Sequence, residues 1–211
     1  MSPEIIALAR KHFQENDRHF YRHIAGIQIK DFEKPQKTDL YHSIVRVILG
    51  QQLSTKAAHT IYQRFLTLFK DSYPWPTRLI KISNEALRAQ GVSRQKAGYL
   101  RNVAQFFLER QWTTEDVIQM EDDYLIEQLT SIKGVGTWTV QMLLMFTLGR
   151  QDILPVDDLG IQKGIKKIYS IEFTGKQLKN EMIRIASSWS PYRTIGCMYL
   201  WRFADGGEPI K

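Results

Sequence analysis

The chain has 211 residues, 43% of them hydrophobic, which is enough apolar material for one sizeable core or two small lobes. The formal net charge of +7 favours a polyanion such as nucleic acid as the partner, although a basic surface also serves solubility. The single cysteine, Cys197, excludes an internal disulfide, a zinc ribbon and a four-thiolate iron–sulfur cluster within the chain.

The same features bear on the cellular compartment. No apolar run approaches the roughly 20 residues that a membrane span needs, and the amino terminus lacks the apolar stretch of a secretory signal. The lone cysteine is typical of a reducing environment. We therefore expect a soluble intracellular protein, located in the cytoplasm or in the nucleoid if it is bacterial.

Apolar residues recur at three- and four-residue spacings along most of the chain, which predicts a nearly all-α fold. Three of the predicted helices begin with a candidate N-cap, Ser54, Ser93 or Thr174. Breaks such as residues 72–77 are too short for domain linkers, so a two-lobed helical bundle is the simplest architecture. The predicted helices span residues 3–16, 39–49, 54–69, 84–90, 93–110, 114–120, 122–130, 136–147, 158–169, 174–187 and 192–203.

Two segments in the first half of the chain pair a predicted helix start with polar or basic side chains. Residues 47–58 (VILGQQLSTKAA) place two glutamines between helices, and residues 91–100 (GVSRQKAGYL) begin a helix with basic side chains. A plain helix break and a solvated basic face explain these patterns about as well as DNA contacts do. The candidate phosphate-contacting residues here are Ser54, Lys56, Arg94 and Lys96.

Residues 129–140 (LTSIKGVGTWTV) predict a helix, a tight glycine turn and a second helix. Gly134 and Gly136 let the backbone approach a ligand closely, and the N–H groups that open the second helix suit a phosphate. An isolated Gly-x-Gly is usually an ordinary turn. Here a set of apolar residues would dock the turn on a core and favours a rigid phosphate clamp. They are Leu129, Ile132, Val135 and Val140.

Residues 152–161 (DILPVDDLGI) predict an apolar, proline-containing loop that delivers Asp157 and Asp158 to the start of a helix. Acids at this position commonly act as helix caps. A catalytic carboxylate is the alternative, and the local sequence leaves both interpretations open.

The glycine turn and the proline loop, which ends in Asp158 about twenty residues later, resemble the defining motif pair of the helix-hairpin-helix DNA glycosylase superfamily. Residues 189–193 (WSPYR) and 199–202 (YLWR) resemble its alkylpurine branch, that of 3-methyladenine DNA glycosylase II. The resemblance covers roughly residues 39–201 and implies two helical lobes with an active-site cleft between them.

The resemblance implies one glycosylase core over residues 1–211, with residues 39–150 as a central lobe and residues 1–38 plus 151–211 as the second lobe. The implied activity is that of a monofunctional glycosylase in base excision repair, which flips alkylated purines such as 3-methyladenine and 7-methylguanine out of the duplex and hydrolyses the N-glycosidic bond. The expected partner is double-stranded DNA with damaged bases. We expect a monomer that needs no cofactor for catalysis.

Asp158 matches the catalytic aspartate of the superfamily, and Asp157 matches the variable position before it, where we expect a helix cap. A fixed negative charge beside the breaking C1′–N bond would stabilise the oxocarbenium character of the sugar. Bifunctional members carry a nucleophilic lysine where this chain has Trp138, so we expect no strand cleavage.

The resemblance also implies the residues that handle the base. Trp201 is expected opposite Asp158 as a stacking platform for a cationic purine. Met142 stands where the pattern often has a tyrosine, and Gln52, or alternatively Leu53, would be the wedge inserted into the duplex. Buried core packing remains an alternative for the tryptophans. The expected base pocket consists of Trp201, Trp138, Gln51 and Met142.

The glycine turn is the implied backbone-binding element. Lys133 stands where the superfamily often has proline, which removes stiffness but adds a phosphate-seeking charge. The carbonyls of Thr130, Ile132 and Val135 are implied ligands of a structural Na⁺ or K⁺. The expected DNA-backbone contacts of the turn are Lys133, Gly134, Val135, Gly136 and Thr137.

Two other functions fit parts of the pattern. A noncatalytic helix-hairpin-helix module would bind DNA without chemistry, and the acid at position 158 argues against it. An unrelated basic helical protein, such as a transcription-associated interaction domain, would bind undamaged DNA sequence-specifically.

Overall fold

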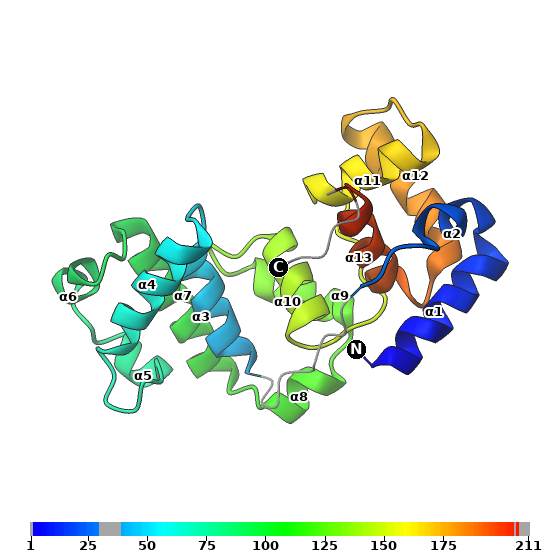
Figure 1. Cartoon of the computed structure of the whole chain (residues 1–211). Helices are drawn as coiled ribbons and strands as arrows, with labels where there is room; N and C mark the ends of the chain where they lie inside the picture. The colour runs from blue at the N-terminus through cyan, green and yellow to red at the C-terminus, as the bar shows by residue number, and fades with distance from the viewer. Residues whose placement is uncertain (1, 30–38, 205, 207–211) are drawn as a thin grey trace. The chain divides into compact units, whose positions relative to one another are not determined.

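A computed structural model of the chain describes residues 2–29, 39–204 and 206. Within these residues every regular element is a helix, which confirms the all-α prediction. None of the helices described is long and apolar enough to cross a membrane. The chain forms two compact units, one of Met1–Pro35 with Leu144–Lys211 and one of Gln36–Leu143 (Figure 1).

The unit of residues 36–143 is organised around one long helix, α7, which packs against α3 and α5. Its core holds side chains such as Ile44, Leu79 and Leu100, which have no exposed surface. The helices that contribute to this unit are α3 (Leu40–Gly50), α4 (Thr55–Leu66), α5 (Pro76–Leu79), α6 (Asn84–Ala89), α7 (Arg94–Arg110), α8 (Thr114–Gln119), α9 (Asp122–Thr130) and α10 (Thr137–Phe146), whose last residues belong to the other unit.

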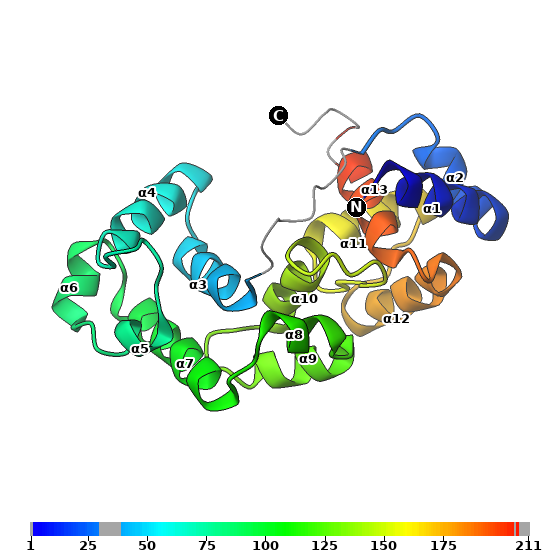
Figure 2. The ribbon, with the colours of Figure 1, turned by 90° about the horizontal axis from the view of Figure 1, so that it is seen from below.

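In the other unit, helix α11 packs along α13, and α1 and α2 cover α13 (Figures 1 and 2). An aromatic cluster fills its core, where the Trp189 and Phe20 rings stack with centroids 4.3 Å apart. Its helices are α1 (Pro3–Asn16), α2 (Arg18–Ile24), α11 (Leu159–Tyr169), α12 (Gly175–Ala186), the short 3₁₀ helix η1 (Ser187–Trp189) and α13 (Arg193–Ala204).

Three local predictions are wrong. The sequence pattern misses α2, which begins directly after α1 because the side chain of Asp17 caps it by accepting from Phe20 N. The break predicted over residues 72–77 ends too late: residues 72–75 are not helical, but Pro76 opens the short helix α5 because proline is tolerated in a first turn. Thr174 precedes α12 without a side-chain cap bond, whereas Ser54 and Ser93 make theirs.

Candidate active site

The loop that leads to Asp158 is anchored to the start of α13. Asp152 accepts hydrogen bonds from Arg193 Nε at 2.7 Å and from Ser190 Oγ at 2.8 Å. The Thr194 hydroxyl accepts from the backbone N–H of Ile153 at 3.0 Å. Burial acts to raise the pKa of Asp152, but the hydrogen bonds from Arg193 and Ser190 outweigh it and hold that pKa below its usual value. These bonds fix the start of the loop against the start of one helix.

Asp158 is the N-cap of α11, and its Oδ1 accepts from the backbone N–H of Ile161 at 2.9 Å. The prediction that Asp157 is the cap is wrong, because Asp158 is the last residue with extended backbone angles before the helix. Asp157 instead forms an exposed ion pair with Lys179. Asp158 itself is half-buried, so the residue is not sealed inside its unit.

Trp201 of α13 contacts the same carboxylate, since its Nε1–H donates to Asp158 Oδ1 at 2.7 Å. Gly160 makes this approach possible, because a Cβ there would lie 2.7 Å from Trp201 Cδ1 and 3.2 Å from Asp158 Oδ1. Phe146 stacks on the indole with ring centroids 5.9 Å apart. Sequence reasoning missed both Phe146 and Gly160. The Gly160–Gly164 pair, one turn apart on α11, was the available signal for a closely packed neighbouring helix.

The pair Asp158–Trp201 combines two chemical capacities. A carboxylate held by a backbone N–H and an indole N–H has a fixed direction and needs no reorganisation to face a developing positive charge. The indole presents an electron-rich face that attracts a cation. Leu159, next to the carboxylate, is 79% exposed and adds an apolar surface at the same helix end.

The hairpin turn joins α9 to α10 in the other unit. Gly134 has a φ of +106°, and a Cβ there would lie 2.2 Å from Cγ of Tyr99, so both the backbone angle and the packed ring require glycine. Ile132 and Val135 are buried, and Val135 N donates to Ile132 O at 3.0 Å. Lys133, by contrast, is exposed. Gly136 and Thr137 are exposed like Lys133. The turn is therefore held by buried apolar side chains on one side and is open to solvent on the other.

The loop between α3 and α4 lies against this turn. Gln51 Nε2 donates to Gly134 O at 3.3 Å. Gln52 is exposed and has a φ of +58°, a left-handed angle that is uncommon outside glycine. Leu53 is 38% exposed, and Ser54 caps α4 by accepting from Ala57 N at 3.3 Å.

Lys96 was predicted as a phosphate contact, yet its ammonium donates to Leu49 O and Gln51 O, each at 2.8 Å. Burial lowers the pKa of Lys96. The two carbonyls give this lysine a role in the loop, and a phosphate contact from it stays a prediction. Lys56 and Arg94 are exposed.

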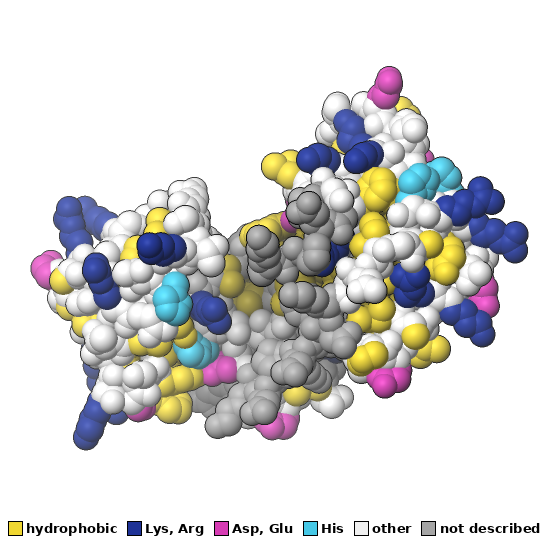
Figure 3. Space-filling view, viewed as in Figure 1, with side chains coloured by type: hydrophobic (Ala, Val, Ile, Leu, Met, Phe, Trp, Pro, Cys, Tyr) yellow, Lys and Arg dark blue, Asp and Glu magenta, His cyan; other side chains and the backbone are white. Residues whose placement is uncertain are grey.

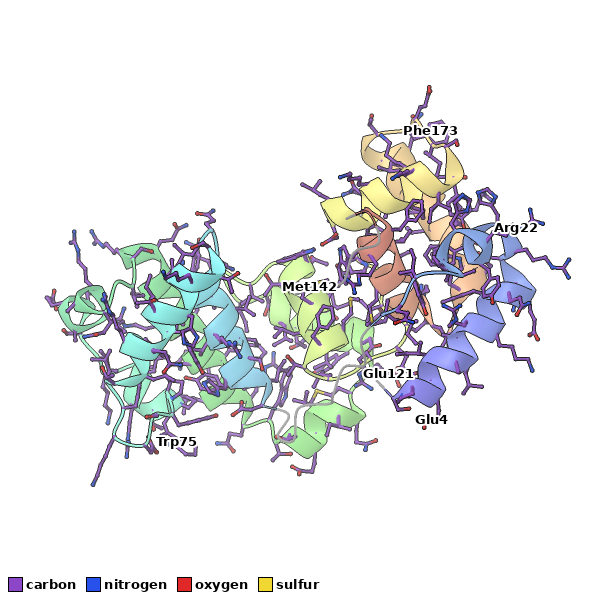
Figure 4. The ribbon with its side chains drawn as sticks, in the orientation of Figure 1. Glu4, Arg22, Trp75, Glu121, Met142 and Phe173 are labelled. Atoms are coloured by element: carbon purple, nitrogen blue, oxygen red, sulfur yellow. The ribbon has the colours of Figure 1, made fainter. Side chains whose placement is uncertain are left out.

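Trp138, in the first turn of α10, is 45% exposed and so is not a buried core residue. Met142 follows one turn later and is half-buried (Figure 4). Residues four apart lie on one face of a helix, so both side chains belong to the same face of α10. On the side of the molecule drawn in Figure 3, Lys and Arg side chains stand on both units.

The structure thus gathers the predicted site residues in two sets. Asp158 and Trp201 touch each other in the unit that contains α11 and α13. Gln51, Gly134 and Lys96 are joined by hydrogen bonds in the unit that contains α7. No group of three or more His, Cys, Asp or Glu side chains suited to a metal ion occurs among the residues described.

Comparison with known proteins points to one family. A family model described as HhH-GPD superfamily base excision DNA repair protein matches residues 45–191. The chain is 33% identical over 181 residues to DNA-3-methyladenine glycosylase 1 of Schizosaccharomyces pombe, covering 83% of this chain and 78% of that protein. The crystal structure of a Bacillus halodurans DNA-3-methyladenine glycosidase superposes with a TM-score of 0.81 at 36% identity, covering 96% of this chain and 89% of the other.

A second solved structure comes from Schizosaccharomyces pombe, whose 3-methyladenine DNA glycosylase was determined in complex with abasic DNA. It superposes with a TM-score of 0.72 at 30% identity and covers 92% of this chain and 95% of that one. The helix-hairpin-helix resemblance seen in the sequence is therefore confirmed.

Proposed function

The chain belongs to the HhH-GPD superfamily of base excision DNA repair proteins, and we propose that within it the protein is a monofunctional glycosylase that releases alkylated purines from double-stranded DNA. The observation that carries this proposal is the 2.7 Å hydrogen bond between Trp201 Nε1 and Asp158 Oδ1. This hydrogen bond places the carboxylate next to the indole ring, and excision of a cationic base needs both an anion and an aromatic face. The relatives named for 3-methyladenine support the same substrate class.

Asp158 is the proposed catalytic residue. As the C1′–N bond lengthens, the deoxyribose gains positive charge, and a preorganised carboxylate stabilises that charge more than it stabilises the neutral ground state. The same carboxylate orients the attacking water and takes its proton. An N-alkylated purine leaves as a neutral base from a cationic one, so it needs little help from a general acid.

The flipped base would be held by aromatic and soft side chains. Trp201 offers an indole face backed by Phe146, whose ring stacks on it, and a charged purine binds that face better than a neutral one does. Trp138, Met142 and Gln51 are the other proposed pocket residues. We expect Met142 to shape base preference.

Trp138 also bears on whether the strand is cleaved after the base has been released. An indole has no amine with which to form a Schiff base on the exposed sugar, so β-elimination has no nucleophile at this position. The product is then an intact strand with an abasic site.

The proposed DNA-backbone contacts are the exposed residues of the hairpin turn together with Ser54, Lys56 and Arg94. Backbone carbonyls suit a hard monovalent cation, and those of Thr130, Ile132 and Val135 would hold Na⁺ or K⁺ there. The cation would offset the charge of a nearby phosphate. We expect the protein to act as a monomer.

A base-release assay tests the proposed function. Duplex DNA carrying 3-methyladenine, 7-methylguanine, ethenoadenine or hypoxanthine is incubated with the protein, and free base and strand breaks are measured separately. We expect release of the two cationic bases first, without strand breaks. Tight binding without any base release would identify a noncatalytic DNA-binding module instead.

A further inference from the structure

The carboxyl end of α3 is where the chain leaves a helix to form the loop of residues 51–54, which contains the expected wedge residue Gln52. The last four carbonyls of a helix have no partner within it. Here Val47 O accepts from Gln51 N at 3.1 Å, and Gly50 O accepts from Leu53 N at 3.2 Å. Leu49 O, between them, is satisfied by a side chain rather than by the backbone.

That side chain is Lys96, which comes from α7 and donates at 2.8 Å both to Leu49 O and to Gln51 O, the first carbonyl beyond the helix. A positive charge at a helix carboxyl end is favourable because the helix dipole is negative there. One ammonium therefore fixes the end of α3 and the first residue of the loop together.

The same helix also holds the hairpin turn. Tyr99, three residues after Lys96, packs its ring on Gly134, and Asn102, three residues later, donates to Lys133 O at 3.1 Å. Residues at this spacing share one face of a helix. A single face of α7 thus supports both the proposed phosphate clamp and the proposed wedge loop.

Gln52 is the next residue along the loop. Its left-handed φ of +58° is one that a non-glycine residue rarely adopts and keeps only where neighbouring groups impose it. The residue before it is tied at both its carbonyl, by Lys96, and its side chain, by Gly134 O. These two hydrogen bonds hold the residue that directly precedes Gln52.

We propose that Lys96 is a positioning residue for duplex opening: its ammonium holds the loop so that Gln52 points outward and enters the base stack. The proposal rests on the proposed function and on the expectation from the sequence that Gln52, rather than Leu53, is the wedge inserted into the duplex. Lys96 acts through the loop and touches neither the base nor the sugar.

The test compares Lys96→Met, which keeps the aliphatic chain but removes the donors, with Lys96→Arg, which keeps the donors. Lys81→Met, an exposed lysine of the same unit, is the matched control. Each change is placed in Asp158→Asn protein, so that opening is measured apart from chemistry. The readout is the fluorescence of 2-aminopurine next to a lesion in duplex DNA, with the melting temperature recorded in parallel.

We expect Lys96→Met to lower the opening equilibrium about tenfold, as for the loss of a charge-assisted hydrogen bond, while Lys96→Arg restores most of it. In a Gln52→Ala background Lys96→Met should have little further effect, because the two residues act as a unit. The proposal would be overturned if Lys96→Met opened the duplex as well as the Asp158→Asn parent does. It would also be overturned if the losses from Lys96→Met and Gln52→Ala were additive in the double variant. Failure of the proposed function would show differently, as absent base release by the unmodified protein.

Discussion

Trp201 makes two contacts that belong to different tasks. Its indole N–H donates to Asp158, and its ring face stacks with Phe146. Both depend on the absence of a side chain at position 160, since a Cβ would occupy the space that the indole edge fills. At the scale of single residues, the candidate site is therefore a three-part arrangement of acid, glycine and indole.

The two tasks of Trp201 can be separated by Trp201→Phe, which keeps an aromatic face and removes the donor. We expect the single-turnover rate of base release to fall about tenfold or more, because a hydrogen bond to a charged group contributes about 1.5–3 kcal/mol. DNA affinity should change little. Trp75→Phe is the matched control, because that exposed indole donates to Asp71 at 2.5 Å, on the unit that lacks Asp158. Equal rates in both variants would show that the bond to Asp158 has no role in turnover.

Part of the residue-scale picture was predictable from sequence. The resemblance of the glycine turn and the proline loop to the superfamily's motif pair singled out Asp158, and the resemblance of the carboxy-terminal aromatics to its alkylpurine branch singled out Trp201. Gly160 was signalled only by its spacing from Gly164, one helical turn later. Phe146 and Tyr99 could not be found that way, because each matters through a contact with a residue distant in the chain. Local patterns carry no information on such contacts.

Among the elements, the loop before α11 depends on one acid. Asp152 ties the start of this loop to Arg193, the first residue of α13, and to Ser190, which precedes that helix. Helices were predictable where apolar spacing was regular, as in α1 and α9, whose bounds match the predicted residues 3–16 and 122–130. The short helices α2 and α5 were missed because a capping acid and a proline, not periodicity, start them.

The ion pair of Asp152 predicts a pH dependence of stability. Its pKa in the folded protein lies below the usual value, so its contribution is fully present above the unfolded pKa of about 3.9 and is lost as pH falls through the folded pKa. We expect Asp152→Asn to lower the free energy of unfolding by roughly 1–2 kcal/mol at pH 7, with both partners part-exposed. The difference from the unmodified protein should shrink below pH 4 in urea titrations. A difference that is constant from pH 7 to pH 3 would contradict this assignment.

For the whole molecule, charge sets the response to salt. With a formal net charge of +7, DNA binding should weaken as salt rises, because each neutralised phosphate releases counterions. Three contacts, from Lys56, Arg94 and Lys133, predict a loss of about 40-fold in affinity between 50 and 200 mM salt.

Replacing one of these three residues tests whether it contacts a DNA phosphate. Lys133→Met should reduce the slope of log affinity against log salt by about one, equally for damaged and undamaged duplexes. Lys81→Met should leave the slope unchanged. A slope that Lys133→Met does not alter would remove the hairpin lysine from the DNA interface.

The proposed catalysis depends on one carboxylate of two adjacent acids, that of Asp158. Asp158→Asn and Asp157→Asn are compared by the release of 7-methylguanine from methylated duplex DNA under single-turnover conditions, with affinity for the same duplex measured in parallel. We predict that Asp158→Asn slows release by about 10²–10³ while binding stays within a few-fold, and that Asp157→Asn, which loses only an exposed ion pair with Lys179, releases base at the rate of the unmodified protein. Normal release by Asp158→Asn would contradict the account.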